Sequence, residues 1–137
     1  MMEIDQIKNE FLETSYRIHL EKEITLKIGE HPIELIKYFP KIVSWAFITA
    51  WNPLPAILSI DQNNNRNSEL LAQLKAANYE TYSGMGISKD KKWSEASFFI
   101  VNIDLAAAHS ISSQFGQLAF LFGDRESGNQ LMFTHKN

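Results

Sequence analysis

One short apolar run constrains the fold of this 137-residue chain more than any other feature. Ser44–Ala50 is rich in β-branched and aromatic residues and is almost wholly apolar. Such a run predicts a strand that has neighbours on both sides and is buried on both faces. Even the longer stretch Ile42–Trp51 falls far short of the roughly 20 residues of a membrane span. We therefore expect a central strand of a sheet in an α+β protein, and no membrane partner.

The segments before this strand alternate between helical and extended periodicity. The spacing predicts a helix over Ile4–Leu12, strands over Ser15–Leu20 and Ile24–Ile28, and a short helix over Pro32–Phe39. The two strands are close enough in sequence to form a hairpin.

The segments after the central strand begin with a loop that contains the asparagine run Asn63–Asn65. A helix capped by Asn67 or Ser68 then extends to Ala77, and Asn78 favours a left-handed end. The elements predicted beyond it are strands over Tyr79–Ile87 and Ser97–Ile103, a helix over Leu105–Phe115 capped by Asp104, and strands over Leu118–Phe122 and Gln130–Thr134.

The order from Ser44 onward is β-α-β-β-α-β plus one strand, which is the order of the ferredoxin-like split βαβ fold. We expect a single domain over 1–137. Residues 1–43 would form a helix and hairpin packed on the core, and residues 44–134 would form the ferredoxin-like core plus a terminal edge strand.

Composition excludes several classes of site. The chain has no cysteine, so it has no disulfide or zinc-thiolate site, and this composition fits a reducing compartment. Its start lacks the pattern of a signal peptide, so we expect a cytoplasmic protein. The net charge is −3 without a basic stripe, so we expect no nucleic-acid partner. We expect no metal or other cofactor, because the histidines lack ligand spacing; they are His19, His31, His109 and His135.

The predicted topology gathers the most distinctive polar residues at one end of the sheet. The loop after Ala50, the start of the next helix, the Gly84–Glu95 hairpin and the end of the last helix all lie there. The candidate site residues are Asn52, Asn63, Arg66, Asn67, Trp93, Glu95 and Gln117.

The same residues carry a family resemblance. The motifs are Ile48-Thr49-Ala50-Trp51-Asn52-Pro53, Leu58-Ser59 with Asn63, Arg66 and Asn67, Gly84-x-Gly86, Trp93-x-Glu95-x-Ser97 and Phe115-Gly116-Gln117. In order and spacing, from about Tyr16 to Phe122, the chain resembles domain-of-unknown-function family 3293, departing from its pattern at Leu118 and Ala96. The resemblance implies the element order and a small bacterial protein, and it implies no activity.

Three functions remain open. In the first, which we favour, the chain is a binding module for a small anionic ligand or a protein partner, anchored by Arg66 beside a helix start. In the second, it is an enzyme in which Glu95 is a general base and Arg66 and Asn52 orient the substrate. In the third, it is a structural protein that forms a homodimer through Gln130–Phe133. An Arg66–Glu95 ion pair with a purely structural role is an alternative to either site.

Overall fold

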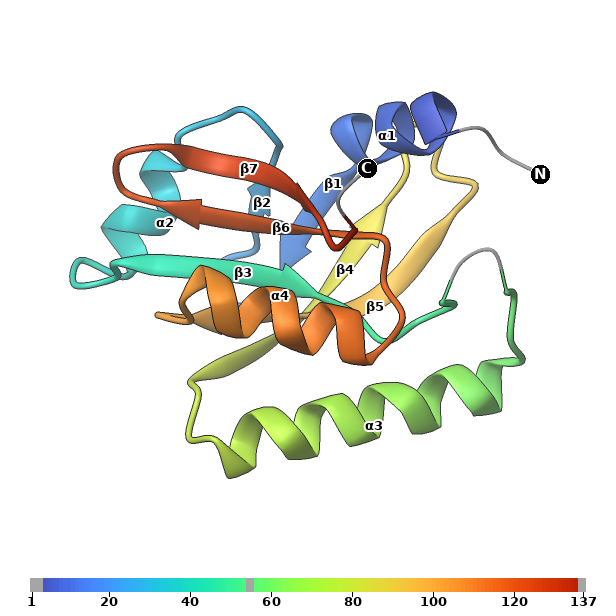
Figure 1. The fold of residues 1–137 in the computed structure, drawn as a ribbon. Coiled ribbons are helices and arrows are strands. Elements are labelled where there is room, and N and C mark those ends of the chain that lie inside the picture. The colour runs from blue at the N-terminus through green and yellow to red at the C-terminus, as the bar shows by residue number, and fades with distance from the viewer. Residues whose placement is uncertain (1–3, 54–55, 136–137) are drawn as a thin grey trace.

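The computed structural model describes residues 4–53 and 56–135, which form an α+β fold around one sheet (Figure 1). The helices are α1 (Ile4–Glu13), α2 (Ile33–Tyr38), α3 (Ile60–Ala76) and α4 (Leu105–Gln114). The strands are β1 (Ser15–Ile18), β2 (Ile24–Leu26), β3 (Ser44–Ile48), β4 (Thr81–Ile87), β5 (Ser94–Val101), β6 (Ala119–Asp124) and β7 (Gly128–Phe133). The seven strands lie in the order β2-β1-β4-β5-β3-β6-β7, and every adjacent pair is antiparallel.

Strand β3 occupies the inner position that its apolar sequence predicts. It pairs with β5 on one side and β6 on the other. Trp45 and Phe47 are buried on one face, while Ala46 and Ile48 are buried on the other. Because side chains alternate along a strand, β3 contributes residues to two separate cores, one on each face of the sheet.

Helices α3 and α4 cover the face on which Ala46 and Ile48 are buried, as Figure 1 shows. Leu70 and Leu74 of α3 and Ile111 of α4 pack with Ile48 and Ile100 in one buried cluster. We call this side of the sheet the helical face.

The opposite face is concave, because the two ends of the sheet come together. Asn129 in β7 accepts a hydrogen bond from the Gly29 N–H at 2.8 Å and donates its own N–H to the Glu30 carbonyl at 2.9 Å. Its side chain accepts from Trp45 Nε1 at 2.8 Å. The curled sheet therefore surrounds a second core, which α2 joins through Leu35. We call this side the inner face.

The start of α3 corrects the sequence prediction. The helix begins at Ile60, not after Asn67 or Ser68, so the asparagine run is helical rather than a loop. Ser59 is the N-cap, and its hydroxyl and the Gln62 side chain form a reciprocal capping box. This local signal, together with tertiary bonds of the asparagines, outweighs their weak helix propensity.

Other helix ends lie where the sequence predicts them. Asp104 caps α4 by accepting from the Ala107 N–H at 2.7 Å, and Gly116 ends it with φ +70°. Asn78 follows α3 with φ +63°. Strand β5 starts at Ser94, three residues earlier than predicted, so Glu95 lies within the sheet.

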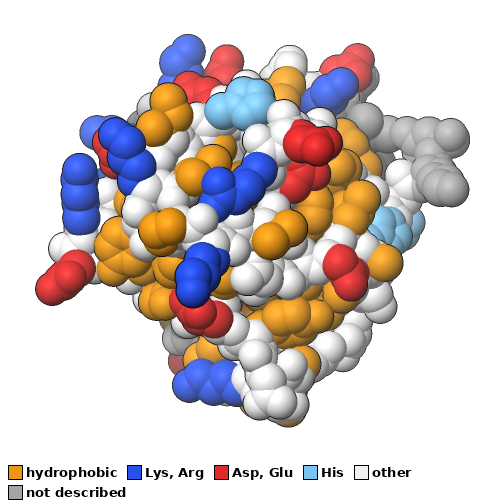
Figure 2. Space-filling view, turned by 90° about the vertical axis from the view of Figure 1, so that its left-hand side faces the viewer, with side chains coloured by type: hydrophobic (Ala, Val, Ile, Leu, Met, Phe, Trp, Pro, Cys, Tyr) orange, Lys and Arg blue, Asp and Glu red, His pale blue; other side chains and the backbone are white. Residues whose placement is uncertain are grey.

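The surface at the α2 end of the molecule carries mixed charges. Figure 2 shows lysine or arginine and aspartate or glutamate side chains interspersed with apolar ones on this face. Within the described residues, no helix is long and apolar enough to cross a membrane.

Candidate functional site

The candidate residues lie at one end of the sheet, but the sheet divides them into two groups. Asn52, Asn63, Arg66, Asn67 and Gln117 surround the chain that leaves β3 toward α3 on the helical face. Trp93 and Glu95 line a pocket on the inner face. The two groups differ in what their polar atoms do.

Arg66 is bonded to main-chain oxygens. Its Nε donates to the Ala50 carbonyl at 2.7 Å, and its Nη2 donates to the Phe115 carbonyl. Its guanidinium carbon also lies 6.0 Å from the centre of the Phe115 ring. Arg66 therefore joins the end of β3 to the C-terminus of α4, where a positive charge is favourable.

The three asparagines extend this network. Buried Asn67 accepts from the Ala50 N–H at 2.8 Å and donates to the Ala96 carbonyl at 2.9 Å. Asn63 accepts from the Asn52 N–H at 2.7 Å and donates to the Asn52 side chain at 2.8 Å. Asn52, with φ +36°, also accepts from the Leu58 N–H. These amides fix the loop between β3 and α3.

Gln117 completes the cluster on the helical face. Its side-chain amide donates to the Trp51 carbonyl at 3.1 Å, and Thr134 donates to its main-chain oxygen at 2.6 Å. We call these five residues the clamp: Asn52, Asn63, Arg66, Asn67 and Gln117. The hydrogen bonds of the clamp go chiefly to main-chain groups that would otherwise be unpaired where the chain leaves the sheet.

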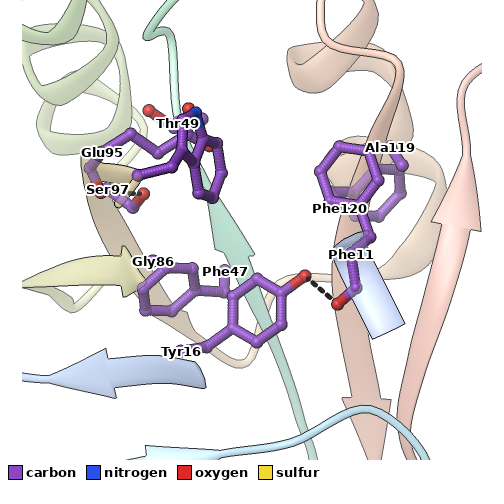
Figure 3. Close-up of a pocket in the computed structure, with 10 residues that line it drawn as sticks. Phe11, Tyr16, Phe47, Thr49, Gly86, Glu95, Ser97, Ala119 and Phe120 are labelled. Carbon is purple, nitrogen blue, oxygen red and sulfur yellow. Dashed lines mark hydrogen bonds between the residues drawn. The ribbon is translucent and has the colours of Figure 1, made fainter. Parts of the chain in front are cut away.

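Glu95 lies on the other side of the sheet because of its register in β5. It is opposite Gly86 of β4, and Gly86 is in turn opposite Tyr16 of β1. The side chains of these rows point to the inner face, and Figure 3 shows Glu95, Thr49 and Ser97 grouped near the rings of Phe47 and Tyr16.

A small pocket lies among these side chains, with α1 contributing Phe11 at its edge. Its free volume is about 20 Å³, room for about one water molecule. The lining residues are Phe11, Tyr16, Phe47, Thr49, Gly86, Trp93, Glu95, Ser97, Ala119 and Phe120. We call this the Glu95 pocket.

The electrostatics of the pocket are dominated by one carboxyl group. Among the described residues, no donor bonds the Glu95 side chain and no cation lies within ion-pair distance. Burial raises its pKa to about 8. Burial, and secondarily the Glu95 charge, raises the pKa of Tyr16, whose hydroxyl donates to the Phe11 carbonyl at 3.0 Å. The pocket thus contains a carboxyl group for which burial favours the protonated form.

The structure does not form the Arg66–Glu95 ion pair that the sequence left open. Arg66 extends from α3 on the helical face, whereas Glu95 points to the inner face. Sequence reasoning placed both residues at the same end of the sheet but did not assign the face. That assignment depends on the register in which β5 pairs with β3 and β4.

Most of the pocket wall carries no functional signal in the sequence. The pattern indicates strands at Tyr16, Phe47 and Thr49 and a helix face at Phe11. One signal was present: Gly84-x-Gly86 removes two inward side chains from β4. A Cβ on Gly84 would lie 2.8 Å from the Phe47 ring, so this glycine makes room for an inward aromatic side chain.

Comparison with known proteins identifies the family. The model of the family described as "Protein of unknown function (DUF3293)" matches residues 48–120, more than half of the chain. The chain belongs to this family, as its motifs suggested. Neither the curated proteins nor the solved structures contain a match. The matched region includes the whole clamp, as well as Trp93 and Glu95 of the pocket.

Proposed function

We propose that this protein binds a small molecule in the Glu95 pocket. The observation that carries the proposal is a carboxyl group that faces a cavity without a partner on the described chain. The Glu95 side chain is partly buried, and withdrawing a carboxyl group from water without giving it a partner costs free energy. A ligand that bonds the Glu95 carboxyl would recover that cost.

The walls of the pocket support the same proposal. Ligand sites are mostly apolar and aromatic with a few convergent polar groups, and this lining has that composition. The cavity is small, so it fits the terminal group of a ligand rather than a whole molecule. The remainder of the ligand would lie outside, beside Trp93.

The geometry favours this pocket over an anion site at Arg66. Two main-chain carbonyls already occupy the Arg66 guanidinium, and an anion would have to compete with them. The anionic ligand or protein partner that the sequence suggested for Arg66 stays a prediction.

An enzyme is the second candidate function, and the carboxyl of Glu95 is what favours it. A carboxyl group whose pKa is near the working pH can both accept and donate a proton. Burial raises the pKa of Glu95 to about 8. In this version Glu95 is the general base, while Arg66 and Asn52 shape the loop rather than orient the substrate.

We further propose that the central part of the chain is a ferredoxin-like split βαβ unit. The adjacent antiparallel order β4-β5-β3-β6 supports this, as does the packing of α3 and α4 on one face. In this view 1–43 and β7 are additions to a single domain over 1–137. Cytoplasmic location and bacterial origin also stay predictions.

A homodimer through the terminal strand remains a proposal as well. Strand β7 is at an edge of the sheet, and Phe133 is 39% exposed. Asn129 already bonds Gly29 and Glu30, so pairing with a second copy would use the part of β7 beyond it.

A fragment screen by two-dimensional NMR tests the proposed site. Amines, carboxylic acids, alcohols and amides of four to six heavy atoms are added to the labelled protein. We expect hits to shift the main-chain amides of Gly86, Glu95 and Ser97, and to lose the effect in Glu95→Ala. Hits that instead move the amides around Arg66 would favour the anion site, and a screen without shifts at the pocket would contradict the proposal.

A further inference from the structure

We infer that the Glu95 pocket takes the primary ammonium group of a small organic amine. This inference rests on the proposed function and adds the chemical class of the ligand. It follows from three properties of the described pocket: the charge of its lining, the kind of surface that surrounds that charge, and the size of the cavity.

The charge of the lining selects a cation. Glu95 contributes the one acidic group, and the described lining includes no lysine, arginine or histidine. An anionic ligand would meet a carboxyl group and no positive charge. A cationic ligand would form a charge-assisted hydrogen bond with Glu95, which is stronger than a bond between neutral groups.

The surrounding surface favours an organic cation over a hydrated metal ion. Half of the lining residues are aromatic: Phe11, Tyr16, Phe47, Trp93 and Phe120. Aromatic faces attract ammonium groups and tolerate the carbon atoms next to them. Metal ions such as Mg²⁺ and Ca²⁺ need several oxygen ligands. In the described parts of the chain, no three His, Asp or Glu side chains are placed to hold a metal.

The size of the cavity selects a primary amine. About 20 Å³ of free volume holds a group of the size of a water molecule. An –NH₃⁺ group meets this limit, whereas a quaternary ammonium group is too wide. The alkyl chain of the amine would then leave the pocket past Trp93.

The protonation of Glu95 predicts how the affinity for an amine should change with pH. The bound form is R–NH₃⁺ beside Glu95–COO⁻, so the carboxyl proton must leave to solvent when the amine binds below pH 8. Because the pKa of Glu95 is about 8, affinity for an amine should rise about tenfold from pH 6 to pH 7. A neutral ligand that accepts a hydrogen bond from the protonated carboxyl would show the opposite trend.

The experiment compares ligands of similar shape. Propylammonium, 1-propanol, propionate and tetramethylammonium are titrated into the full chain at pH 6, 7 and 8, at constant ionic strength. Binding is followed by the Gly86 and Ser97 amide shifts, and proton release by calorimetry in two buffers of different ionisation enthalpy. We expect propylammonium to bind at about millimolar affinity, as its few heavy atoms allow, and tetramethylammonium to bind at least tenfold more weakly.

Variants separate a specific site from general charge attraction. Glu95→Gln should lose at least tenfold in affinity for propylammonium and should lose the proton release. Glu69→Gln, on the exposed side of α3, removes the same charge elsewhere and should change neither. The pH trend of the wild type is a measurement that does not depend on how well a variant folds.

The outcomes distinguish the inference from the proposed function. If 1-propanol or propionate binds at the pocket in a Glu95-dependent way and propylammonium does not, the inference is overturned and the binding site stands. If propylammonium binds without proton release, or equally well to Glu95→Gln, the inference is also overturned. If no probe shifts the pocket amides, both the inference and the proposed site fail.

Discussion

The clamp on the helical face and the Glu95 pocket on the inner face lie at the same end of one sheet. They differ in whether their polar side chains have hydrogen-bond partners. In the clamp, Arg66 and Asn67 bond main-chain groups just after β3, within β5 and just after α4. In the pocket, the Glu95 carboxyl has no partner on the described chain. Polar residues that look equally functional in a sequence therefore separate into those the main chain needs and those it does not.

The difference has a simple physical cause. The chain leaves β3 at Thr49 and crosses to α3, so its N–H and C=O groups lose their strand partners and take side-chain partners instead. Strands β4 and β5 pair in regular register through Glu95. Glu95 therefore lies inside a paired strand segment, and among the described residues its carboxyl group bonds no main-chain group.

The largest expected effect is the loss of the clamp. Arg66→Ala removes two charge-assisted hydrogen bonds and leaves the carbonyls of Ala50 and Phe115 without them. We expect the free energy of unfolding, measured by urea denaturation, to fall by about 3–5 kcal/mol. Alanine is a good helix former, so the lost stability would come from the missing tertiary hydrogen bonds and not from a weaker helix.

Lys75→Ala is the matched control for this variant, because Lys75 is an exposed cation on the same helix. It should cost less than about 1 kcal/mol. A similar small loss in Arg66→Ala would mean that the clamp does not hold the loop.

A smaller effect compares the two inward glycines of β4. A Cβ on Gly84 would lie 2.5 Å from the Arg17 carbonyl oxygen and 2.8 Å from the Phe47 ring. Gly84→Ala should therefore destabilise the fold by about 1–3 kcal/mol, as overpacking does. A Cβ on Gly86 meets its neighbours at 3.7 Å or more, so Gly86→Ala should change stability by less than about 0.5 kcal/mol.

Thermal or urea unfolding of the two alanine variants checks this pair. The matched substitution differs in position alone, so equal losses would contradict the packing described around Phe47. If Gly86→Ala is folded and stable, it would also provide a variant with a narrower Glu95 pocket.

The smallest expected effect on the fold depends on pH. Burial raises the pKa of Glu95 from 4.5 to about 8, so its contribution to stability is complete below pH 4.5 and is lost as pH rises through 8. Glu95→Gln keeps a neutral side chain at every pH. We expect it to match the wild type at pH 5 and to exceed it by about 1–2 kcal/mol at pH 9, a figure reduced for the partial exposure of the side chain.

The measurement is the difference in unfolding free energy between wild type and Glu95→Gln across pH 5–9. Other titrating groups cancel in that difference, and Glu69→Gln should show no such trend. A difference that is constant with pH would mean that the Glu95 carboxyl is solvated, and would weaken the proposed site.

Local signals predicted much of the secondary structure. Alternation predicted β1 and β2, the continuous apolar run predicted β3, and the capping residue Asp104 predicted the start of α4. The predicted start of α3 was wrong because the capping box of Ser59 and Gln62 outweighs the weak helix propensity of the asparagine run. That capping signal is present in the sequence.

The candidate site shows the limit of local signals. The sequence placed Asn52, Arg66 and Glu95 at one end of the sheet, and the structure places them there. It could not show that Arg66 would bond main-chain carbonyls, because those carbonyls become unpaired only when β3 ends. Nor could it show that Tyr16, over 70 positions away, would lie beside Glu95.

By itself, then, the sequence determined the α+β character, the double burial of β3 and the family, since these depend on periodicity and on local motifs. Only the tertiary structure decided which polar groups are paired and which is not. The face to which Glu95 points follows from strand register, and its unpaired state follows from what β1, β3 and α1 bring to that face. Both are properties of contacts between distant segments, which no local pattern encodes.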